Sequence, residues 1–342
     1  MKKKGVPSLK TITILVPAYN EEEVLDQLYS RLTGVIESVP NYNFEILFVN
    51  DGSKDNTLNM IKEFRVRDNR ISYVDLSRNF GKETAMIAGL DHAAGDAVII
   101  IDADLQDPPE LIPEMIQYWE QGYDDVYAKR RSRAGESWAK KWTAGKFYSL
   151  LKKTTRIPIQ ENTGDFRLLD RRCVEALKQI RETQRYTKGM FSWIGYNKKE
   201  ILFDRDPRAA GETKWNYFKL IDLAIEGITS FTTAPLRLAS FFGFTVSFGA
   251  FCYMLWIIIK TLMHGESVSG YPSMMTAILF LGGVQLIAVG IIGEYLGRIF
   301  NETKNRPLYF VDEYNDDKVT NLDEKPAAKL YRVEDHKVKS NR

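Results

Sequence analysis

Short aliphatic runs alternate with amphipathic stretches through about the first 130 residues of the chain. The runs are rich in β-branched residues, as buried strands are, and they occupy residues 11–17, 44–50, 71–77 and 96–102. Stretches with helical periodicity separate them. This alternation predicts an α/β domain with a largely parallel, doubly wound, Rossmann-like sheet, in which ligands bind beyond the carboxyl ends of the strands.

Two local patterns predict where helices begin. Asn20 followed by Glu23 has the spacing of a capping box for the first helix. The Pro-Pro-Glu sequence at residues 108–110 suits the first turn of another helix, because proline lacks the backbone N–H that a first turn leaves unpaired.

The chain becomes strongly apolar near its C-terminal end, from about residue 234 to about residue 297. Residues 238–259 contain no charged side chain, and neither do residues 274–293. At about 1.5 Å rise per residue, the first of these stretches is long enough to cross a hydrocarbon core of about 30 Å. The pattern predicts a hairpin of two transmembrane helices over 236–262 and 272–298; a pair of buried core helices is the alternative.

The charges that flank this hairpin predict its orientation. Arg237 precedes the first apolar stretch, and Arg298, Lys304 and Arg306 follow the second, whereas the connecting segment holds Lys260 and one histidine. Positively charged flanks stay in the cytoplasm, so both termini are expected there. The pattern therefore predicts a multi-pass protein of the inner (plasma) membrane whose N-terminal domain is cytoplasmic.

The rest of the chain divides around the hairpin. Residues 1–214 contain the predicted α/β domain, and residues 215–233 have the broad apolar face of an amphipathic helix that lies at the membrane interface. An ordinary amphipathic core helix explains the same pattern. Residues 299–342 are expected to form a cytoplasmic tail, charged and disordered beyond Asp312.

Composition excludes some classes of protein. Lys and Arg number 47 and Asp and Glu number 45, which gives a net charge of +2 over 342 residues, so no strong field predicts a nucleic-acid partner. Two cysteines, Cys173 and Cys252, do not make a disulfide framework and fit a reducing compartment. The basic start of the chain lacks the apolar core of a secretory signal.

Acidic residues gather where the fourth predicted strand ends, at Asp102, Asp104 and Asp107. The glycine signatures of dinucleotide-binding and P-loop folds do not occur, which disfavours both classes of enzyme. A divalent cation held by carboxylates can neutralise phosphate instead. Asp102 and Asp104 point to one side of an extended chain and, with Gln106, would converge on one ion; an acidic strand end that caps the next helix is the alternative.

Six motifs follow one another in an order that resembles a known family. They are ILVPAYNEE (14–22), FVNDGSKDNT (48–57), SRNFGKETAMIAGL (77–90), DADLQDPPE (102–110), TGDFRLLDRR (163–172) and RAAGETKW (208–215). Together they resemble family 2 glycosyltransferases of the GT-A fold. Within that family they resemble the polyprenyl-phosphate glycosyltransferases, which are bacterial relatives of dolichol-phosphate mannose synthase and include the undecaprenyl-phosphate glucosyltransferase type.

The resemblance implies a donor site for a UDP-sugar. Its nucleotide-binding residues would be Pro17, Tyr19, Glu21, Asp51, Ala103 and Lys214. Asp102, Asp104 and Gln106 would hold Mg²⁺ or Mn²⁺ on the diphosphate, where the ion stabilises charge on the departing nucleotide. Arg208 would be catalytic beside Lys214, since RAAGETK resembles a mobile loop of the family that closes over the pyrophosphate.

The resemblance also implies a site for the acceptor. Asp165 occupies the position of the family's catalytic aspartate, and because a phosphate acceptor is already ionised at neutral pH, we expect positioning of it at least as much as proton removal. A structural cap before Phe166 is the alternative. The acceptor phosphate would meet Arg130, Arg133 and Lys141, in a basic segment that a membrane-surface helix also explains.

The motifs together predict inverting transfer of one sugar, from UDP-glucose or UDP-N-acetylglucosamine, to undecaprenyl phosphate at the cytoplasmic membrane face. The Q-x-x-R-W motif of processive relatives is absent. The alternatives are another donor, GDP-mannose or an amino-arabinose derivative, and a membrane scaffold without catalysis. The expected partners are a nucleotide-sugar, polyprenyl phosphate, membrane lipid, a flippase and further copies of the chain in a homo-oligomer, but no nucleic acid.

Overall fold

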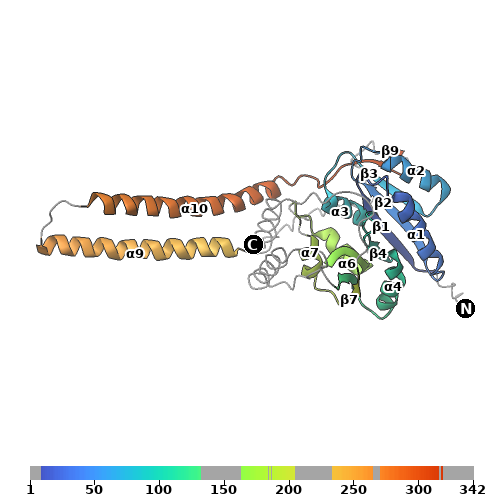
Figure 1. The fold of residues 1–342 in the computed structure, drawn as a ribbon, viewed down its shortest axis with the longest axis horizontal. Coiled ribbons are helices and arrows are strands. Elements are labelled where there is room, and N and C mark those ends of the chain that lie inside the picture. The colour runs from blue at the N-terminus through green and yellow to red at the C-terminus, as the bar shows by residue number, and fades with distance from the viewer. Residues whose placement is uncertain are drawn as a thin grey trace, which may run out of the picture.

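The computed structural model describes residues 9–131, 163–183, 185, 187–204, 233–264, 270–315 and 317–318. An α/β domain lies at one end of the molecule (Figure 1). Helices α9 (Ala234–His264) and α10 (Tyr271–Thr303) project from it side by side as a long hairpin.

Within the described residues, one nine-stranded sheet has the order β7-β5-β6-β4-β1-β2-β3-β8-β9. The strands are β1 (Thr11–Ala18), β2 (Asn43–Asn50), β3 (Ile71–Leu76), β4 (Ala97–Ile100), β5 (Asp125–Arg130), β6 (Thr163–Asp170), β7 (Lys198–Phe203), β8 (Val311–Tyr314) and β9 (Asp317–Lys318). The four strands expected from the aliphatic runs are confirmed, and they form the parallel centre of the sheet. Antiparallel pairings flank this centre on both sides.

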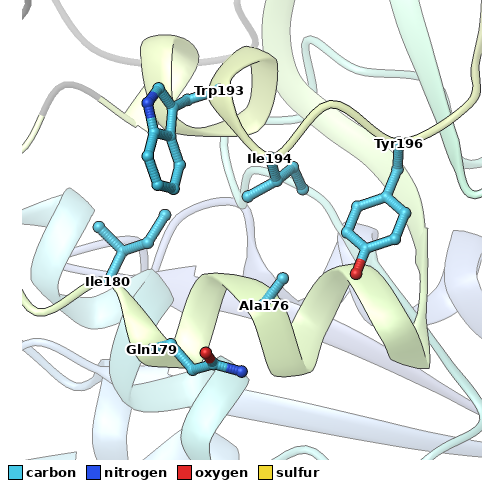
Figure 2. A pocket seen from close by; sticks show the side chains of 6 residues that line it. All are labelled: Ala176, Gln179, Ile180, Trp193, Ile194 and Tyr196. Atoms are coloured by element: carbon cyan, nitrogen blue, oxygen red, sulfur yellow. The ribbon is translucent and has the colours of Figure 1, made fainter.

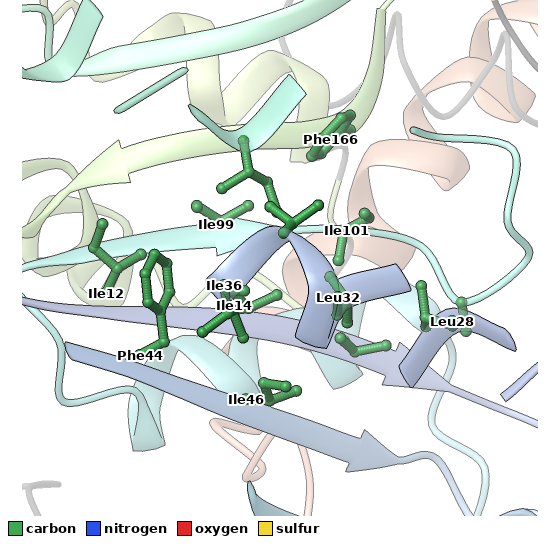
Figure 3. Close-up of a cluster of buried hydrophobic side chains, with 14 of the residues drawn as sticks. Ile12, Ile14, Leu28, Leu32, Ile36, Phe44, Ile46, Ile99, Ile101 and Phe166 are labelled. Carbon is green, nitrogen blue, oxygen red and sulfur yellow. The ribbon is translucent and has the colours of Figure 1, made fainter. Parts of the chain in front are cut away.

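Helices cover both faces of the sheet. They are α1 (Leu25–Glu37), α2 (Thr57–Arg67), α3 (Lys82–His92), the 3₁₀ turn η1 (Pro109–Leu111), α4 (Ile112–Glu120), α6 (Arg171–Gln179) and α7 (Thr187–Trp193). On one face of β1, Ile12 and Ile14 point into a core that contains Leu28 and Leu32 of α1 and extends to Phe166 of β6 (Figure 3). The other face packs against α3, α6 and α7. Burial on both faces explains why these strands read as continuous aliphatic runs.

The expected capping box at the first helix is wrong. Helix α1 begins at Leu25, and its N-cap is Val24, whose side chain cannot accept a hydrogen bond. The Asn20 side chain instead accepts a hydrogen bond from the backbone N–H of Lys54 at 2.8 Å, with Asn20 itself in the left-handed region at φ 55°. Asparagine tolerates this conformation better than most residues. The hydrogen bond from Lys54 joins the loop after β1 to the loop after β2. The expected helix start at Pro109 is confirmed, because η1 begins there.

A buried ion pair fixes β5 to β6. Arg167 and Asp125 are both fully buried, and a guanidinium nitrogen lies 3.1 Å from the Asp125 carboxylate. The guanidinium also stacks over the Phe191 ring at 3.7 Å, which brings α7 against the sheet. Burial raises the pKa of Asp125, and the Arg167 charge opposes that shift. The pair therefore holds three elements together behind the segment that carries Asp165.

We predict that Arg167→Leu destabilises the fold by about 3–5 kcal/mol, because it leaves the Asp125 carboxylate buried without its main counter-charge. Denaturant unfolding of the detergent-solubilised protein, followed by tryptophan fluorescence, measures this loss. Arg172→Leu is the matched control, since that arginine is 66% exposed and its ion pair spans 3.6 Å; it should cost less than about 1 kcal/mol. Equal effects of the two changes would contradict the structural role of the buried pair.

The helical hairpin agrees with the apolar pattern of the sequence only in part. Many of its large apolar side chains are exposed, among them Phe244 and Leu286. Among the described residues, one segment, Phe280–Thr303 of α10, is long and apolar enough to cross a membrane. The apolar part of α9, Leu238–Tyr253, is shorter, about 24 Å at 1.5 Å per residue. One span thus passes the test of length and composition, whereas the second remains a prediction.

The expected disorder beyond Asp312 is wrong for the residues that follow at once. Strand β8 pairs antiparallel with β3, and β9 pairs with β8. Glu313 accepts hydrogen bonds from the Tyr73 hydroxyl and, at 2.8 Å, from Lys62. Strand β8 has only four residues and no apolar periodicity, so its pairing could not be read from the sequence. The chain therefore returns to the domain after the hairpin. The interfacial helix expected over 215–233 lies, except for Thr233, outside the described residues.

Candidate active site

The site forms where the parallel strands β4, β1 and β2 end side by side. The expected residues Pro17, Tyr19, Asp51, Asp102 and Ala103 all lie at these carboxyl ends. Their convergence follows from the parallel pairing, in which strands that run in one direction also end on one edge. The predicted position of the ligand site in the fold is thus supported by the topology.

The loop after β4 is shaped by one strained residue. Leu105 has φ 59°, in the left-handed region that costs about 1–2 kcal/mol for a residue with a Cβ, and its side chain is buried. Asp104 and Gln106 flank Leu105, and the Asp104 carboxylate accepts a hydrogen bond from the backbone N–H of Gln106 at 3.2 Å. Burial of Leu105 stabilises the turn, which holds the two candidate metal ligands in one compact loop.

Asp165 lies across from Asp102 because of strand register. Strand β6 runs antiparallel to β4 and pairs Arg167 with Ile100. Continued two residues beyond the end of β4 and two residues back toward the start of β6, the same register would set Asp165 opposite Asp102. The two carboxylates therefore meet although 63 residues separate them in the chain (165 minus 102).

Lys82 joins these two carboxylates. It is the first residue of α3, and its Nζ lies 2.5 Å from Asp165 Oδ2 and 2.7 Å from Asp102 Oδ2, donating a hydrogen bond to each. The ammonium nitrogen also lies 2.7 Å from Asp102 Oδ1, but the angles at this contact are not those of a hydrogen bond. Asp102 Oδ1 is buried and accepts no hydrogen bond from any described residue. Lys82 lies within one of the six motifs, but the sequence predicted no role for it. A single lysine at the start of a helix carries no signal that distinguishes it from a lysine exposed to solvent.

The charges in this group shift one another's protonation. Burial raises the pKa of Asp102, even though the Lys82 ammonium acts against it. Burial alone would raise the pKa of Asp165, but Lys82 more than offsets this and lowers it. The same two carboxylates raise the pKa of Lys82 against the effect of its own burial. Asp165 is therefore a carboxylate and Lys82 an ammonium at neutral pH.

Two further charged residues surround this group, and the sequence assigned a role to neither. Glu83 accepts a hydrogen bond from the backbone N–H of Thr187 at 2.9 Å, which joins α3 to the start of α7. Burial, followed by the nearby Asp165 charge, raises the pKa of Glu83 to about 7. Burial lowers the pKa of Lys188, although Asp165 acts in the opposite direction. Charges of both signs, most of them partly buried, thus surround Asp165.

Asp51 has a structural role that the sequence did not predict. It is almost fully buried, and its two carboxylate oxygens accept hydrogen bonds from the backbone N–H groups of Phe80 at 2.7 Å and Gly81 at 2.9 Å. Burial raises the pKa of Asp51, and these two hydrogen bonds oppose the shift. Asp51 therefore fixes the loop that leads to Lys82. Tyr19, by contrast, is 41% exposed at the end of β1.

Of the three residues expected to bind the acceptor phosphate, Arg130 is the one that lies within the described residues. A Cβ placed on Gly164 would lie 3.7 Å from Arg130 Nη2 and 3.9 Å from Asp107 Oδ2. The guanidinium is therefore close to the residue that precedes Asp165. The other expected cations, Arg133, Lys141, Arg208 and Lys214, lie outside the described residues.

The donor set at the end of β4 fits a divalent cation with few protein ligands. Among the described residues, no group of three or more His, Cys, Asp or Glu side chains forms a metal site. Mg²⁺, however, is commonly bound through one or two carboxylates, with phosphate oxygens and water as its other ligands. Asp102 and Asp104 supply two carboxylates, and the buried Asp102 Oδ1 accepts no hydrogen bond within the part of the chain that the structure describes, although Lys82 Nζ is 2.7 Å away. These residues fit an ion that binds together with a diphosphate.

A pocket of about 540 Å³ lies away from these carboxylates, between α6 and the segment after α7 (Figure 2). Its lining residues are Ala176, Gln179, Ile180, Trp193, Ile194 and Tyr196. This lining offers neither a carboxylate nor a basic side chain. The candidate active site is therefore the one at the edge of the sheet.

Comparison with known proteins identifies the family. Residues 13–178 match glycosyl transferase family 2, and residues 234–299 match the GtrB C-terminal hairpin. The chain is 52% identical over 302 residues to an uncharacterized glycosyltransferase of Synechocystis, covering 88% of this chain and 95% of that one. It is 48% identical over 300 residues to the bactoprenol glucosyl transferase of Shigella phage SfII, covering 88% and 97%. A prophage bactoprenol glucosyl transferase homolog of Escherichia coli is 46% identical over 300 residues, with 88% and 98% covered.

The chain belongs to glycosyl transferase family 2. It is a glycosyltransferase whose α/β domain has the GT-A fold, followed by a helical hairpin of the GtrB type. The resemblance inferred from the six motifs is confirmed, and so is the prediction of an enzyme. The scaffold without catalysis is therefore not retained.

Proposed function

We propose that this enzyme transfers a single sugar, with inversion, from UDP-glucose or UDP-N-acetylglucosamine to undecaprenyl phosphate at the cytoplasmic face of the membrane. The observation that carries the proposal is that Asp102 and Asp165 both accept hydrogen bonds from Lys82, close to Arg130. The same chain also has an apolar helical hairpin. The names of relatives that are 46–48% identical, bactoprenol glucosyl transferases, support the same substrate class.

On the donor side, Asp102, Asp104 and Gln106 would hold Mg²⁺ or Mn²⁺. When bound, that ion would stabilise negative charge on the departing nucleoside diphosphate. Nucleotide binding is proposed for Pro17, Tyr19, Glu21, Asp51, Ala103 and Lys214. The exposed Tyr19 ring supports this role, because an aromatic face outside the core is suited to stacking on a base. Asp51 would act chiefly through the loop that it fixes.

On the acceptor side, Asp165 would position the acceptor phosphate or tune its electrostatic environment at least as much as it would take a proton. A phosphate monoester is already ionised at neutral pH, so its oxygen can attack the anomeric carbon directly from the face opposite the leaving nucleotide. Arg130, with Arg133 and Lys141, would hold the remaining phosphate oxygens, and Arg208 would assist the leaving diphosphate. The lowered pKa of Asp165 supports a role as a permanent carboxylate.

The lipid acceptor requires the site to lie close to a membrane. We propose that α9 and α10 both cross the plasma membrane, over 236–262 and 272–298, with the α/β domain in the cytoplasm. The candidate span in α10 and the exposed apolar side chains of both helices support this arrangement. A homo-oligomer and a flippase that carries the product across the membrane belong to the same proposal.

Incubation of membranes with a panel of nucleotide-sugars and undecaprenyl phosphate tests the proposed reaction. Mass spectrometry of the lipid extract should detect a product heavier by one hexose with UDP-glucose, or by one N-acetylhexosamine with UDP-N-acetylglucosamine. Membranes with Asp165→Asn protein are the control. A product formed only with GDP-mannose or an amino-arabinose donor would replace the proposed donor, and a product carrying several sugars would contradict single transfer.

A further inference from the structure

The Lys82 ammonium lies between two carboxylates of the candidate site, Asp102 and Asp165. Its ammonium donates to Asp102 at 2.7 Å and to Asp165 at 2.5 Å. Both carboxylates are largely buried, with 19% and 12% of their side chains exposed. Two carboxylates this close to one ammonium would repel each other strongly in its absence, so Lys82 balances charge in the state without a ligand.

The same carboxylate, Asp102, is one of the two proposed metal ligands. A divalent cation on Asp102 would lie within a few Å of the Lys82 ammonium, and the repulsion between like charges at that distance is large compared with thermal energy. The ion and the ammonium therefore cannot both hold their most favourable positions on Asp102. Binding of one must weaken binding of the other.

The lysine side chain is suited to give way. It is 44% exposed, and a flexible four-carbon stem allows its ammonium to reach other acceptors. Its backbone, in contrast, is fixed: Asp51 holds the N–H groups of Phe80 and Gly81, the two residues before it. Only the side chain is free to move, and the nearest new acceptors that a donor would bring are the oxygens of its diphosphate.

We propose that Lys82 is an internal counter-ion that competes with the divalent cation for Asp102, so that the cation binds tightly only together with a nucleoside diphosphate that takes over the ammonium. This inference rests on the proposed metal role of Asp102. It makes Lys82 a positioning residue, since it acts through the carboxylates and the cation.

The test measures Mn²⁺ binding to the full-length, detergent-solubilised protein by electron paramagnetic resonance of the free ion, with and without UDP. In the unaltered protein, UDP should tighten Mn²⁺ binding at least tenfold. Lys82→Gln should bind Mn²⁺ without UDP about tenfold or more tighter than the unaltered protein, and UDP should then add little. Lys82→Arg keeps the charge and should restore weak binding without UDP.

Lys62→Gln is the matched control, because it also removes one positive charge from a lysine that is paired with a carboxylate, here Glu313 of β8 and not a residue of the site. It should bind Mn²⁺ as the unaltered protein does. Unchanged or weaker binding by Lys82→Gln would overturn the inference, as would equal Mn²⁺ affinity with and without UDP in the unaltered protein, a measurement that needs no variant to fold. If no Mn²⁺ binds even with UDP, the proposed metal role of Asp102 fails instead.

Discussion

We expect Asp165→Asn to lower the turnover number about a thousandfold while the protein stays folded. Asparagine has nearly the same shape, so packing around residue 165 is kept, but the charge that meets Lys82 at 2.5 Å is lost. Removal of one preorganised electrostatic group at a reacting centre typically costs about 10²–10³ in rate, and here the acceptor also loses its positioning group. Initial rates at saturating donor and lipid, together with thermal unfolding, measure both expectations.

The matched control for this prediction is Asp91→Asn at the other end of α3. Asp91 is as buried as Asp165, with 13% of its side chain exposed, and it also loses an ion pair, with Arg181 at 2.7 Å. The Asp91→Asn change should lower the stability of the fold modestly and leave the turnover number within about twofold of that of the unaltered protein. A turnover for Asp165→Asn that is no lower than that of the control would remove Asp165 from the site.

Asp104→Ala should abolish transfer at every Mn²⁺ or Mg²⁺ concentration tested, a loss of about a thousandfold or more. The change removes one of the two carboxylates that are proposed to bind the cation, and a cation that stabilises the leaving group contributes several kcal/mol. The fold should survive, because the hydrogen bond to Gln106 lies within the loop itself. Rates measured over a range of metal concentrations give the result.

Asp26→Ala, an exposed aspartate in the first turn of α1, serves as the control for Asp104→Ala and should leave the rate unchanged. If Asp104→Ala turns over nearly normally with either ion present, the metal role of this loop is wrong. If it turns over only at high metal concentration, the residue contributes affinity but is not essential.

The strands and the edge of the sheet that carries the site could be predicted from the sequence. Aliphatic, β-branched runs are buried on both faces, so β1 to β4 were recognisable, and parallel strands necessarily end on one edge. The acidic loop after β4 could be found for the same reason, since charged residues directly behind a buried strand are unusual. Local pattern therefore predicted the strands and the loop that holds the proposed metal ligands.

The contacts inside the site could not be predicted, because they depend on pairing between distant segments. The antiparallel register of β6 against β4 sets Asp165 opposite Asp102, and no local pattern encodes that register. Lys82 reaches both only once α3 has packed on the sheet. Asp51 was expected to contact the nucleotide, but its carboxylate is used by two backbone N–H groups that the sequence could not place.

Diffraction from crystals soaked with UDP and MnCl₂, recorded for the anomalous signal of manganese, tests the proposed donor site most directly. We expect one strong manganese peak within bonding distance of the Asp102 and Asp104 carboxylates, between them and the diphosphate of UDP, with the Lys82 ammonium moved from Asp102 to a phosphate oxygen. UDP bound elsewhere, or bound at the end of β4 without manganese on these two carboxylates, would contradict the proposal.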